Sequence, residues 1–408
     1  MSARLRLALQ LLLAAAMLLS AQTHAGETSP LSFLGEGKAQ LSFRYRLETV
    51  DQDGMAENAR ASTLKTRLTY KTPAENNIQL LLEADNVLRL GGALYSDGNT
   101  TVPGYPVVAD PTGTEINQAY LKLTPAAAST FSLGRQRIHF DDQRFIGRVA
   151  WRQNEQTYDA VTAGFDLARG TTLALGYLWN INRIFGPDGG AQAADWACQC
   201  YVLNLSAPIW EGGKLVMFAY ELDIEDAISQ ANRTLGFRVT GVRKPTEKSE
   251  LGYLFSYASQ TDTGMNAVDY RASYFHARVD FRHGEIKGRA GLELLGGDNA
   301  VSGSQFVSPL ATLHAFNGWA DKFLGIPDAG LRDFYLGVDL PVSGATASIV
   351  WHRFTADDGG ANYGTEWNLS IAKELKKGLS VLGKLADFDS EGFATDTTKA
   401  WLMLSYSP

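Results

Sequence analysis

The sequence lacks most of what a soluble enzyme or a zinc-binding domain would need. Only two cysteines occur among 408 residues, Cys198 and Cys200, and no second Cys pair or His cluster completes a zinc site. The single residue between them makes a poor disulfide span in an extended strand. We expect ordinary strand residues here, with a local bridge left open.

Long apolar runs are also missing after the N-terminal apolar stretch. No later run approaches the roughly 20 residues that a transmembrane helix needs. A formal charge of -7 argues against a nucleic-acid partner, since such domains usually carry a basic patch. No Gly-x-Ser-x-Gly elbow, His-Glu-x-x-His helix or phosphate loop occurs, so we expect neither an enzyme nor a cofactor or metal site.

The first residues have the pattern of an export signal. Arg4 and Arg6 precede the apolar stretch Leu7–Leu19, and small residues follow up to Ala25. We predict a signal peptide over residues 1–25, removed after Sec-type export, and a short periplasmic segment over 26–36. Residues 37–408 are then expected to form one domain.

That domain alternates between apolar and polar residues. In Leu41–Leu47 every second residue is apolar and those between are polar or cationic, and Leu64–Tyr70 repeats this pattern except at Thr66. A period of two places the two sets on opposite faces of a β-strand. A soluble sandwich would alternate too, so the connections must decide.

The connections alternate between short and long. Short turns are predicted at Thr72–Asn77, Thr124–Ser129, Ala168–Thr171, Pro208–Gly213, Lys244–Ser249, Arg282–Glu285, Pro341–Ala345 and Lys376–Gly378. The longest loops are predicted at Val87–Thr114, His139–Thr157, Ile181–Ala197 and Gly296–Gly330. Short periplasmic turns and long extracellular loops are typical of outer-membrane barrels. We therefore predict an all-β fold: a transmembrane antiparallel up-and-down β-barrel of about eighteen strands, with both termini periplasmic.

Aromatic side chains gather at the strand ends of the apolar face, as in the interfacial girdles of such barrels. Leu68 and Leu254 are also assigned to the lipid face. The aromatic set is Phe43, Tyr70, Tyr177, Trp179, Tyr253, Phe255, Tyr257, Trp351, Trp367, Trp401 and Tyr406.

The polar set should face the lumen, because an Arg or Lys against lipid at the bilayer midplane costs about 2–4 kcal/mol. These charges either pair into ladders that stiffen the wall or leave a positive surplus that selects anions. The expected cations are Arg44, Arg46, Lys65, Arg67, Arg135, Arg137, Arg144, Arg152, Arg238, Lys287, Arg289 and Lys384. The acids among them include Glu48, Glu83, Asp85, Glu293, Asp339 and Glu366.

Four stretches resemble the alginate-export family of outer-membrane porins: Gly134–Phe145, Trp151–Asp159, Thr312–Leu324 and Tyr363–Trp367. The likeness covers about Gly37 to Pro408. It implies an eighteen-stranded monomeric barrel whose electropositive constriction passes an anionic polysaccharide. By motif position, it implies that Arg135, Arg137, Arg144 and Arg152 line the constriction.

The third stretch lies in the longest loop and mixes aromatic with polar residues. We expect it either to narrow the entrance or to shield the rim. Its candidate constriction residues are His314, Asn317, Trp319, Asp321 and Lys322.

The predicted function is an outer-membrane channel of a Gram-negative bacterium with a basic lumen that passes anionic solutes, as in anionic polysaccharide export. The alternatives are an uptake porin for small anionic or carbohydrate nutrients, and a plugged structural or adhesive barrel. The expected partners are membrane lipid and lipopolysaccharide. If the protein is an exporter, a periplasmic scaffold protein is expected as a further partner.

Overall fold

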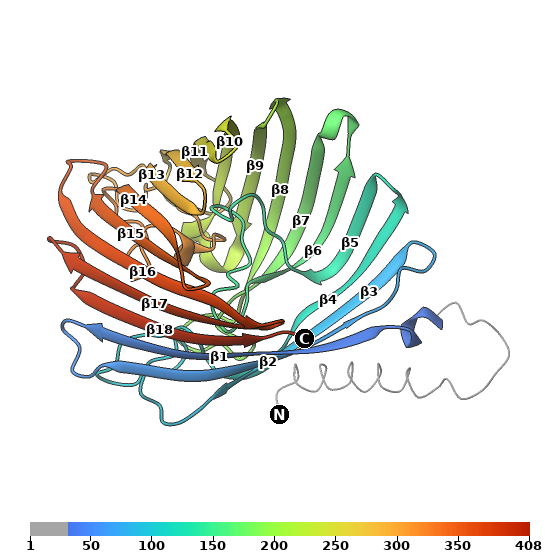
Figure 1. Ribbon diagram of the computed structural model, residues 1–408, viewed down its shortest axis with the longest axis horizontal. Coiled ribbons are helices and arrows are strands. Elements are labelled where there is room, and N and C mark those ends of the chain that lie inside the picture. The colour runs from blue at the N-terminus through green and yellow to red at the C-terminus, as the bar shows by residue number, and fades with distance from the viewer. Residues whose placement is uncertain (1–31) are drawn as a thin grey trace.

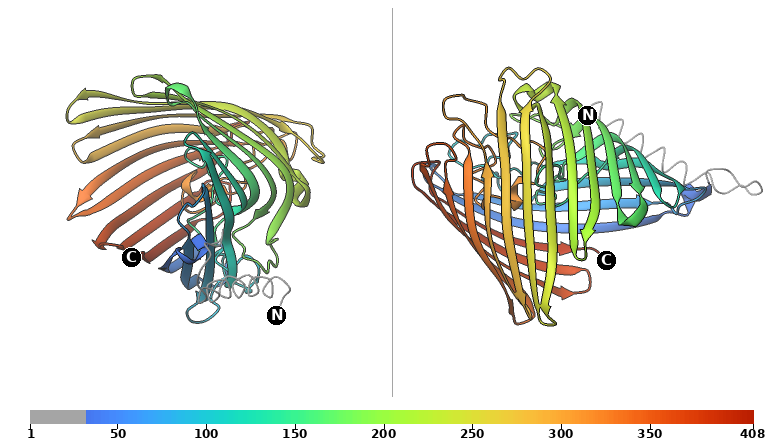
Figure 2. Two further views of the ribbon diagram at one scale, coloured as in Figure 1. Left: turned by 90° about the vertical axis from the view of Figure 1, so that its right-hand side faces the viewer. Right: turned by 90° about the horizontal axis from the view of Figure 1, so that it is seen from above.

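The computed structural model describes residues 32–408, so the predicted signal peptide and residues 26–31 lie outside the described residues. Eighteen strands form one antiparallel sheet in which each strand pairs with its sequence neighbours and β1 pairs with β18. The sheet is therefore a closed barrel, as predicted. Figure 1 shows its strands lying side by side as a tilted wall, and Figure 2 shows the same wall from two further directions.

The strands are β1 (Lys38–Gln52), β2 (Ala59–Lys71), β3 (Ile78–Arg89), β4 (Gly113–Ala126), β5 (Ser129–Gln136), β6 (Thr157–Asp166), β7 (Thr172–Asn182), β8 (Asp195–Trp210), β9 (Gly213–Ile224), β10 (Asn232–Thr246), β11 (Ser249–Asp262), β12 (Arg271–His283), β13 (Ile286–Leu295), β14 (Leu331–Val342), β15 (Ala345–Thr355), β16 (Asn362–Lys376), β17 (Leu379–Ser390) and β18 (Thr397–Tyr406). Short 3-10 helices occupy Ser32–Gly35, Ala168–Gly170, Glu225–Gln230 and Leu313–Ala315. No helix among the described residues is long and apolar enough to cross a membrane.

The turns and loops fall where the sequence predicts them. All eight short turns join strands at one end of the barrel, and the four long loops lie at the other. The turn before β17 shows why glycine is needed at such a position. Gly378 has a φ of +78°, and a Cβ there would come within 2.3 Å of the Ser407 carbonyl oxygen.

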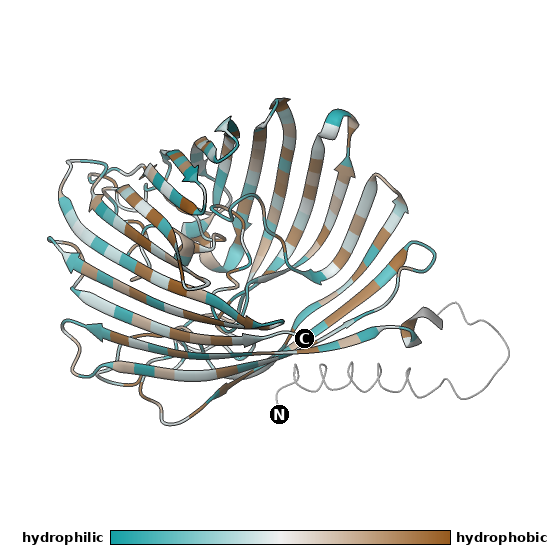
Figure 3. Ribbon diagram, viewed as in Figure 1, coloured by the Kyte–Doolittle hydropathy of each residue, from teal (hydrophilic) through white to brown (hydrophobic). Residues whose placement is uncertain are grey.

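Inside and outside alternate along each strand. In β1, Leu41 and Phe43 are 42% and 37% exposed on the outer face, whereas Arg46 and Glu48 are fully buried inside. Figure 3 shows this alternation as bands of hydrophobic and hydrophilic residues along the strands. The outer apolar set provides the lipid-facing belt that a membrane barrel requires.

The prediction of a lipid-facing side chain is wrong for two residues. Leu254 and Trp401 are 6% and 4% exposed and lie on the inner face, because their strand neighbours Phe255 and Leu402 are the outward residues. The sequence prediction assumed a polar interior. The inner wall instead carries an apolar cluster in which Phe145 and Phe306, from two loops, pack on Tyr274 of β12. Cys198 and Cys200 are buried in the same cluster and are free, so the local bridge left open by the sequence does not form.

Candidate functional site: three loops folded into the barrel

Three long loops fold into the barrel and contact its inner wall (Figure 1). They are residues 90–112 between β3 and β4, residues 137–156 between β5 and β6, and residues 296–330 between β13 and β14. Most of the predicted lumen cations contact one of these loops. Their contacts therefore define what the interior can do.

Glu155 ties the loop 137–156 to the wall. Its carboxylate lies 3.0 Å from the Arg67 guanidinium and 3.7 Å from the Lys65 ammonium, and it also accepts a hydrogen bond from Arg137. Burial disfavours the charged form, but Lys65, Arg67 and Arg137 outweigh it and hold the pKa of Glu155 well below its usual range. The carboxylate therefore stays ionised as a fixed partner of three cations.

The same cations also bind acids of the wall. Arg67 donates two hydrogen bonds to Asp85, of 2.7 and 2.6 Å, in the bidentate geometry that guanidinium groups favour. Arg137 donates to Glu83, which also accepts from Thr69 and Asn117. Charges of both signs thus alternate across β2, β3 and the start of the loop 137–156.

The two predicted lumen arginines of β1 contact the loops inside the barrel. Arg44 donates to the carbonyl oxygens of Ala150, at 2.8 Å, and of Arg152. Arg46 pairs with Asp110 at 3.0 Å and lies 4.4 Å over the Trp151 ring. Both residues act as anchors for the loops 90–112 and 137–156.

Arg152 joins two loops to the wall. Its guanidinium lies 3.2 Å from Glu48 of β1 and 3.0 Å from Asp321 of the loop 296–330. Burial disfavours this cation, yet the carboxylates of Glu48, Asp110 and Asp321 raise the pKa of Arg152 above its ordinary value. It is a permanent charge shared between β1 and the loop 296–330.

Asp321 is the corresponding anion. It accepts from His314 at 2.7 Å and lies 3.1 Å from the Lys399 ammonium of β18. Burial alone would raise the pKa of Asp321, but Lys399, His314 and Arg152 together hold it well below its usual range.

Lys384 is surrounded by aromatic rings. Its ammonium lies 2.8 Å from His314 Nε2 and 4.1, 3.7 and 5.3 Å from the ring centroids of Trp151, Trp319 and Trp401. Cation–π attraction of this kind is strongest when the cation is shielded from water. Lys384 therefore contributes to packing of the loops.

A second contact between loop and wall centres on Arg144. It pairs with Glu293 of β13 at 2.6 Å and donates to Asn317 at 3.3 Å. Asn317 in turn donates to Glu293 and to Asp333, at 2.7 and 3.2 Å. Glu366 receives backbone hydrogen bonds from Trp319 and Ala320 of the same loop.

The loops 137–156 and 296–330 are also joined to each other. The Gly147 amide donates to Leu310 at 2.8 Å, and the Thr312 amide donates to Gln143 at 3.0 Å. The Trp151 and His314 rings stack with centroids 4.3 Å apart. The two loops form one packed unit.

The remaining predicted residues lie apart from this unit or at its edge. Arg238 pairs with Asp142 of the loop 137–156 at 2.6 Å. The prediction that Arg135 lines the lumen is wrong: two residues beyond the outward-facing Leu133, it pairs with Asp159 at 2.7 Å on the outer face of β5 and β6. On the inner face, Arg289 pairs with Asp339 at 3.1 Å. Lys287 is exposed on β13 and Lys322 is half-buried in the loop 296–330.

Among residues 32–408, nine of the twelve predicted cations have a carboxylate within ion-pair distance: Arg46, Lys65, Arg67, Arg135, Arg137, Arg144, Arg152, Arg238 and Arg289.

Sequence reasoning missed the loop partners. Asp110, Glu155 and Arg148 lie in irregular segments where no periodicity reports direction. Within residues 32–408, Arg148 makes no ion pair within 4 Å. Burial, followed by the charges of Arg148 and Arg137, lowers the pKa of His139, which indicates a positive potential at this loop.

The part of the chain that the structure describes holds no group of three or more His, Cys, Asp or Glu residues placed to bind a metal ion. The arrangement is instead a network of fixed charges around inward loops. Such a network can narrow an aqueous passage and set its local potential.

Comparison with known proteins agrees with this geometry. Residues 37–171 match the family model described as alginate export, which confirms the resemblance over that part of the chain. The stretches Thr312–Leu324 and Tyr363–Trp367 lie beyond the match. None of the curated protein sequences compared with the chain matches it.

Solved porin structures share the fold. OccAB4 of Acinetobacter baumannii superimposes with a TM-score of 0.73 at 14% identity, covering 93% of this chain and 100% of its own. OpdK of Pseudomonas aeruginosa, solved with vanillate, gives 0.72 at 15% identity, covering 92% and 100%. The chain thus has the barrel fold of these outer-membrane porins.

Proposed function

We propose that this barrel is a passive channel that favours small anionic solutes. The observation that carries the proposal is the set of loops held inside the wall by ion pairs such as Arg46–Asp110 and Arg152–Glu48. Loops fixed in this way reduce the free cross-section of a barrel that would otherwise enclose a wide aqueous channel. Small solutes pass such an opening more readily than a polymer does.

Anion preference in this proposal comes from one cation of the loop 137–156 and not from the whole predicted set. Arg46, Arg67, Arg144 and Arg152 are neutralised by buried carboxylates and serve to hold the loops. Arg148 lacks such a neighbour within residues 32–408 and is half-buried. We assign anion attraction to Arg148.

Export of an anionic oligosaccharide or polysaccharide is the second candidate. The match of residues 37–171 to the alginate-export family supports it. The bound vanillate of OpdK, a small aromatic carboxylate, favours small anions by analogy of fold alone. The two candidates share the channel and differ in the size of what passes.

Planar-bilayer recording tests the proposal. In a salt gradient, the wild-type channel should reverse at a potential shifted towards that of chloride. Arg148→Gln should reduce this shift, whereas Lys377→Gln, in the exposed turn before β17, should leave it unchanged. Vanillate should pass with little block, while alginate oligomers should block from one side.

Rapid passage of alginate oligomers would favour the export candidate. A barrel that conducts no ions would overturn both and favour the plugged structural alternative. A reversal potential that does not respond to Arg148→Gln would remove this arginine from the selectivity mechanism.

A further inference from the structure

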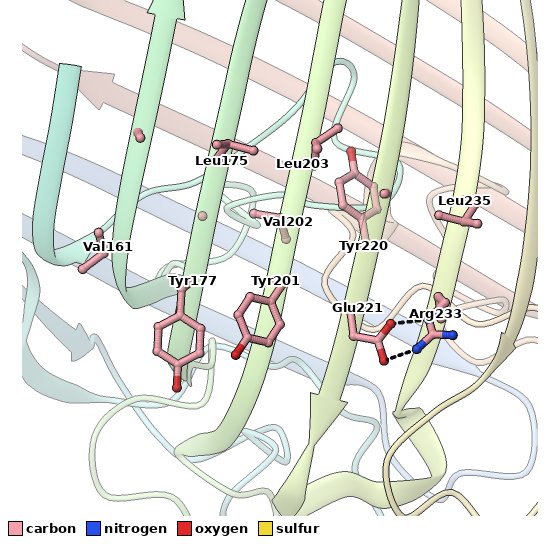
Figure 4. Close-up of a pocket in the computed structure, with 13 residues that line it drawn as sticks. Val161, Leu175, Tyr177, Tyr201, Val202, Leu203, Tyr220, Glu221, Arg233 and Leu235 are labelled. Carbon is pink, nitrogen blue, oxygen red and sulfur yellow. Dashed lines mark hydrogen bonds and ion pairs between the residues drawn. The ribbon is translucent and has the colours of Figure 1, made fainter. Parts of the chain in front are cut away.

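The outer wall of the barrel carries a groove that the channel function does not use. It has a volume of about 510 Å³ and runs across β6 to β10. Figure 4 shows its side chains in two rows on the outer face, with an ion pair at one end.

Strand register builds these rows. In the first, Val161, Tyr177, Tyr201, Glu221 and Arg233 are consecutive cross-strand partners. Paired residues of an antiparallel sheet lie on the same face, so all five point outward. The row therefore changes from aliphatic through aromatic to charged as it crosses the wall.

The second row makes the groove deep. Its partners in order are Ala163, Leu175, Leu203, Ala219 and Leu235. The short side chains of Ala163 and Ala219 stand beside larger leucines, so the surface is recessed there. Leu235 is 54% exposed and forms one edge.

The charged end lies at the extracellular side. β9 reaches Glu221 just before the extracellular segment 225–231, and β10 begins just after it. Glu221 accepts from Arg233 at 3.0 Å and from the Thr263 hydroxyl. The row continues from Arg233 through Thr261 to Arg271, so two arginines follow Glu221 on the same side.

Arg233 keeps donors available for a ligand. Its side chain is 55% exposed despite the pair with Glu221, and a guanidinium has five N–H donors. Arg271 is exposed on the same face. Guanidinium groups bind phosphate oxygens in bidentate fashion.

We propose that this groove is a binding site for a phosphorylated glycolipid of the outer leaflet, the lipid anchor of lipopolysaccharide. An acyl chain lies over Ala163 and Ala219, and the sugar-linked phosphate contacts Arg233 and Arg271. Tyr177 and Tyr201, whose rings lie 5.1 Å apart, occupy the interfacial level between them. The site depends on the barrel lying in the outer membrane and is independent of what the channel passes.

Native mass spectrometry of the detergent-solubilised full barrel, titrated with purified lipid A, tests the site. Wild-type protein should bind one lipid A molecule with saturable affinity. Arg233→Gln combined with Arg271→Gln should weaken that binding at least tenfold. The matched control is Arg353→Gln, which removes an outward-facing exposed arginine of β15 that lies outside the groove.

Ala219→Leu keeps the charges and fills the recess, and it should weaken binding as well. Because Ala219 faces lipid, this change is compatible with the folded barrel, which circular dichroism would check. Unchanged binding in both groove variants would overturn the site. Equal affinity for lipid A and phosphatidylglycerol would also overturn it, since it would mean non-specific boundary lipid.

Discussion

Arg144 and Glu293 form an ion pair of 2.6 Å between a loop and a strand that are 149 residues apart in the sequence. Their side chains are 1% and 3% exposed. A buried pair of this kind is costly to break, because the remaining charge loses its partner without regaining water. The pair therefore gives a direct test of how firmly the loop 137–156 is held.

Arg144→Met should lower the free energy of unfolding by about 3–5 kcal/mol, since it leaves Glu293 charged and buried. Arg144→Met combined with Glu293→Met should recover most of this loss, because neither charge remains. Urea unfolding in detergent, followed by tryptophan fluorescence, measures both. Arg282→Met, which breaks an exposed pair with Glu250, should leave the unfolding midpoint unchanged. A single variant as stable as wild type would mean that the loop is not anchored here.

Deletion of residues 313–324 should raise single-channel conductance. This segment supplies His314, Asp321 and Trp319 to the interior, so its removal widens the passage. Deletion of residues 186–193, from the loop between β7 and β8, is the matched control and should change conductance little. Equal conductance in wild type and the first variant would remove the constriction hypothesis.

Acidification should weaken loop docking through His314. Burial lowers the pKa of His314 to about 3, with Lys384 and Arg152 acting in the same direction and Asp321 opposing. A released His314 would titrate near about 6.5. The released state thus binds the additional proton between these values. Docking is complete above about pH 6.5 and loses up to about 1.4 kcal/mol per pH unit as the pH falls towards 3.

Unfolding free energy measured between pH 7 and pH 4 checks this slope. His314→Gln should flatten the curve in that window, and His283→Gln, at the exposed end of β12, should not. Protonation of Asp321, whose pKa is also lowered, adds a further loss only below its ordinary value of 3.8. An identical slope in wild type and His314→Gln would contradict the assignment.

Leu68→Arg should destabilise the barrel by about 2–4 kcal/mol if the residue lies near the bilayer midplane. Leu68 is 42% exposed on the outer face of β2. Ser132→Arg, on the inner face of β5, should be tolerated, because lumen substitutions change selectivity more than stability. Folding into lipid vesicles with urea titration compares the two. If Leu68→Arg is tolerated, the assignment of the inner and outer faces of the barrel is reversed.

The wall could be predicted from the sequence because its pattern is local. Alternation in Leu41–Leu47, together with turns such as Lys376–Gly378, determines both strand direction and side-chain face. The prediction failed at Trp401 and Leu254, where apolar residues also occupy the inner face. Trp401 packs there against Trp151 and His314, which belong to two loops distant in the sequence.

For each ion pair between the wall and a loop, the sequence predicted the position of the strand residue but not that of its loop partner. Arg46 and Arg67 could be assigned to the lumen by strand parity. Their partners Asp110 and Glu155 could not, since a loop carries no periodic signal of where it folds. Charge that looked like a positive surplus in the strands is therefore balanced by acids from the loops.

The pairing of β1 with β18 brings Phe43 beside Tyr406. This seam cannot close until β18 has been synthesised, since β18 is the last strand of the barrel to be made. Before that moment the growing sheet has two unpaired edges, which are prone to join other chains. The whole polypeptide must therefore cross the periplasm before the barrel has closed. Pairing of β1 with β18 at the membrane is then the last step of assembly.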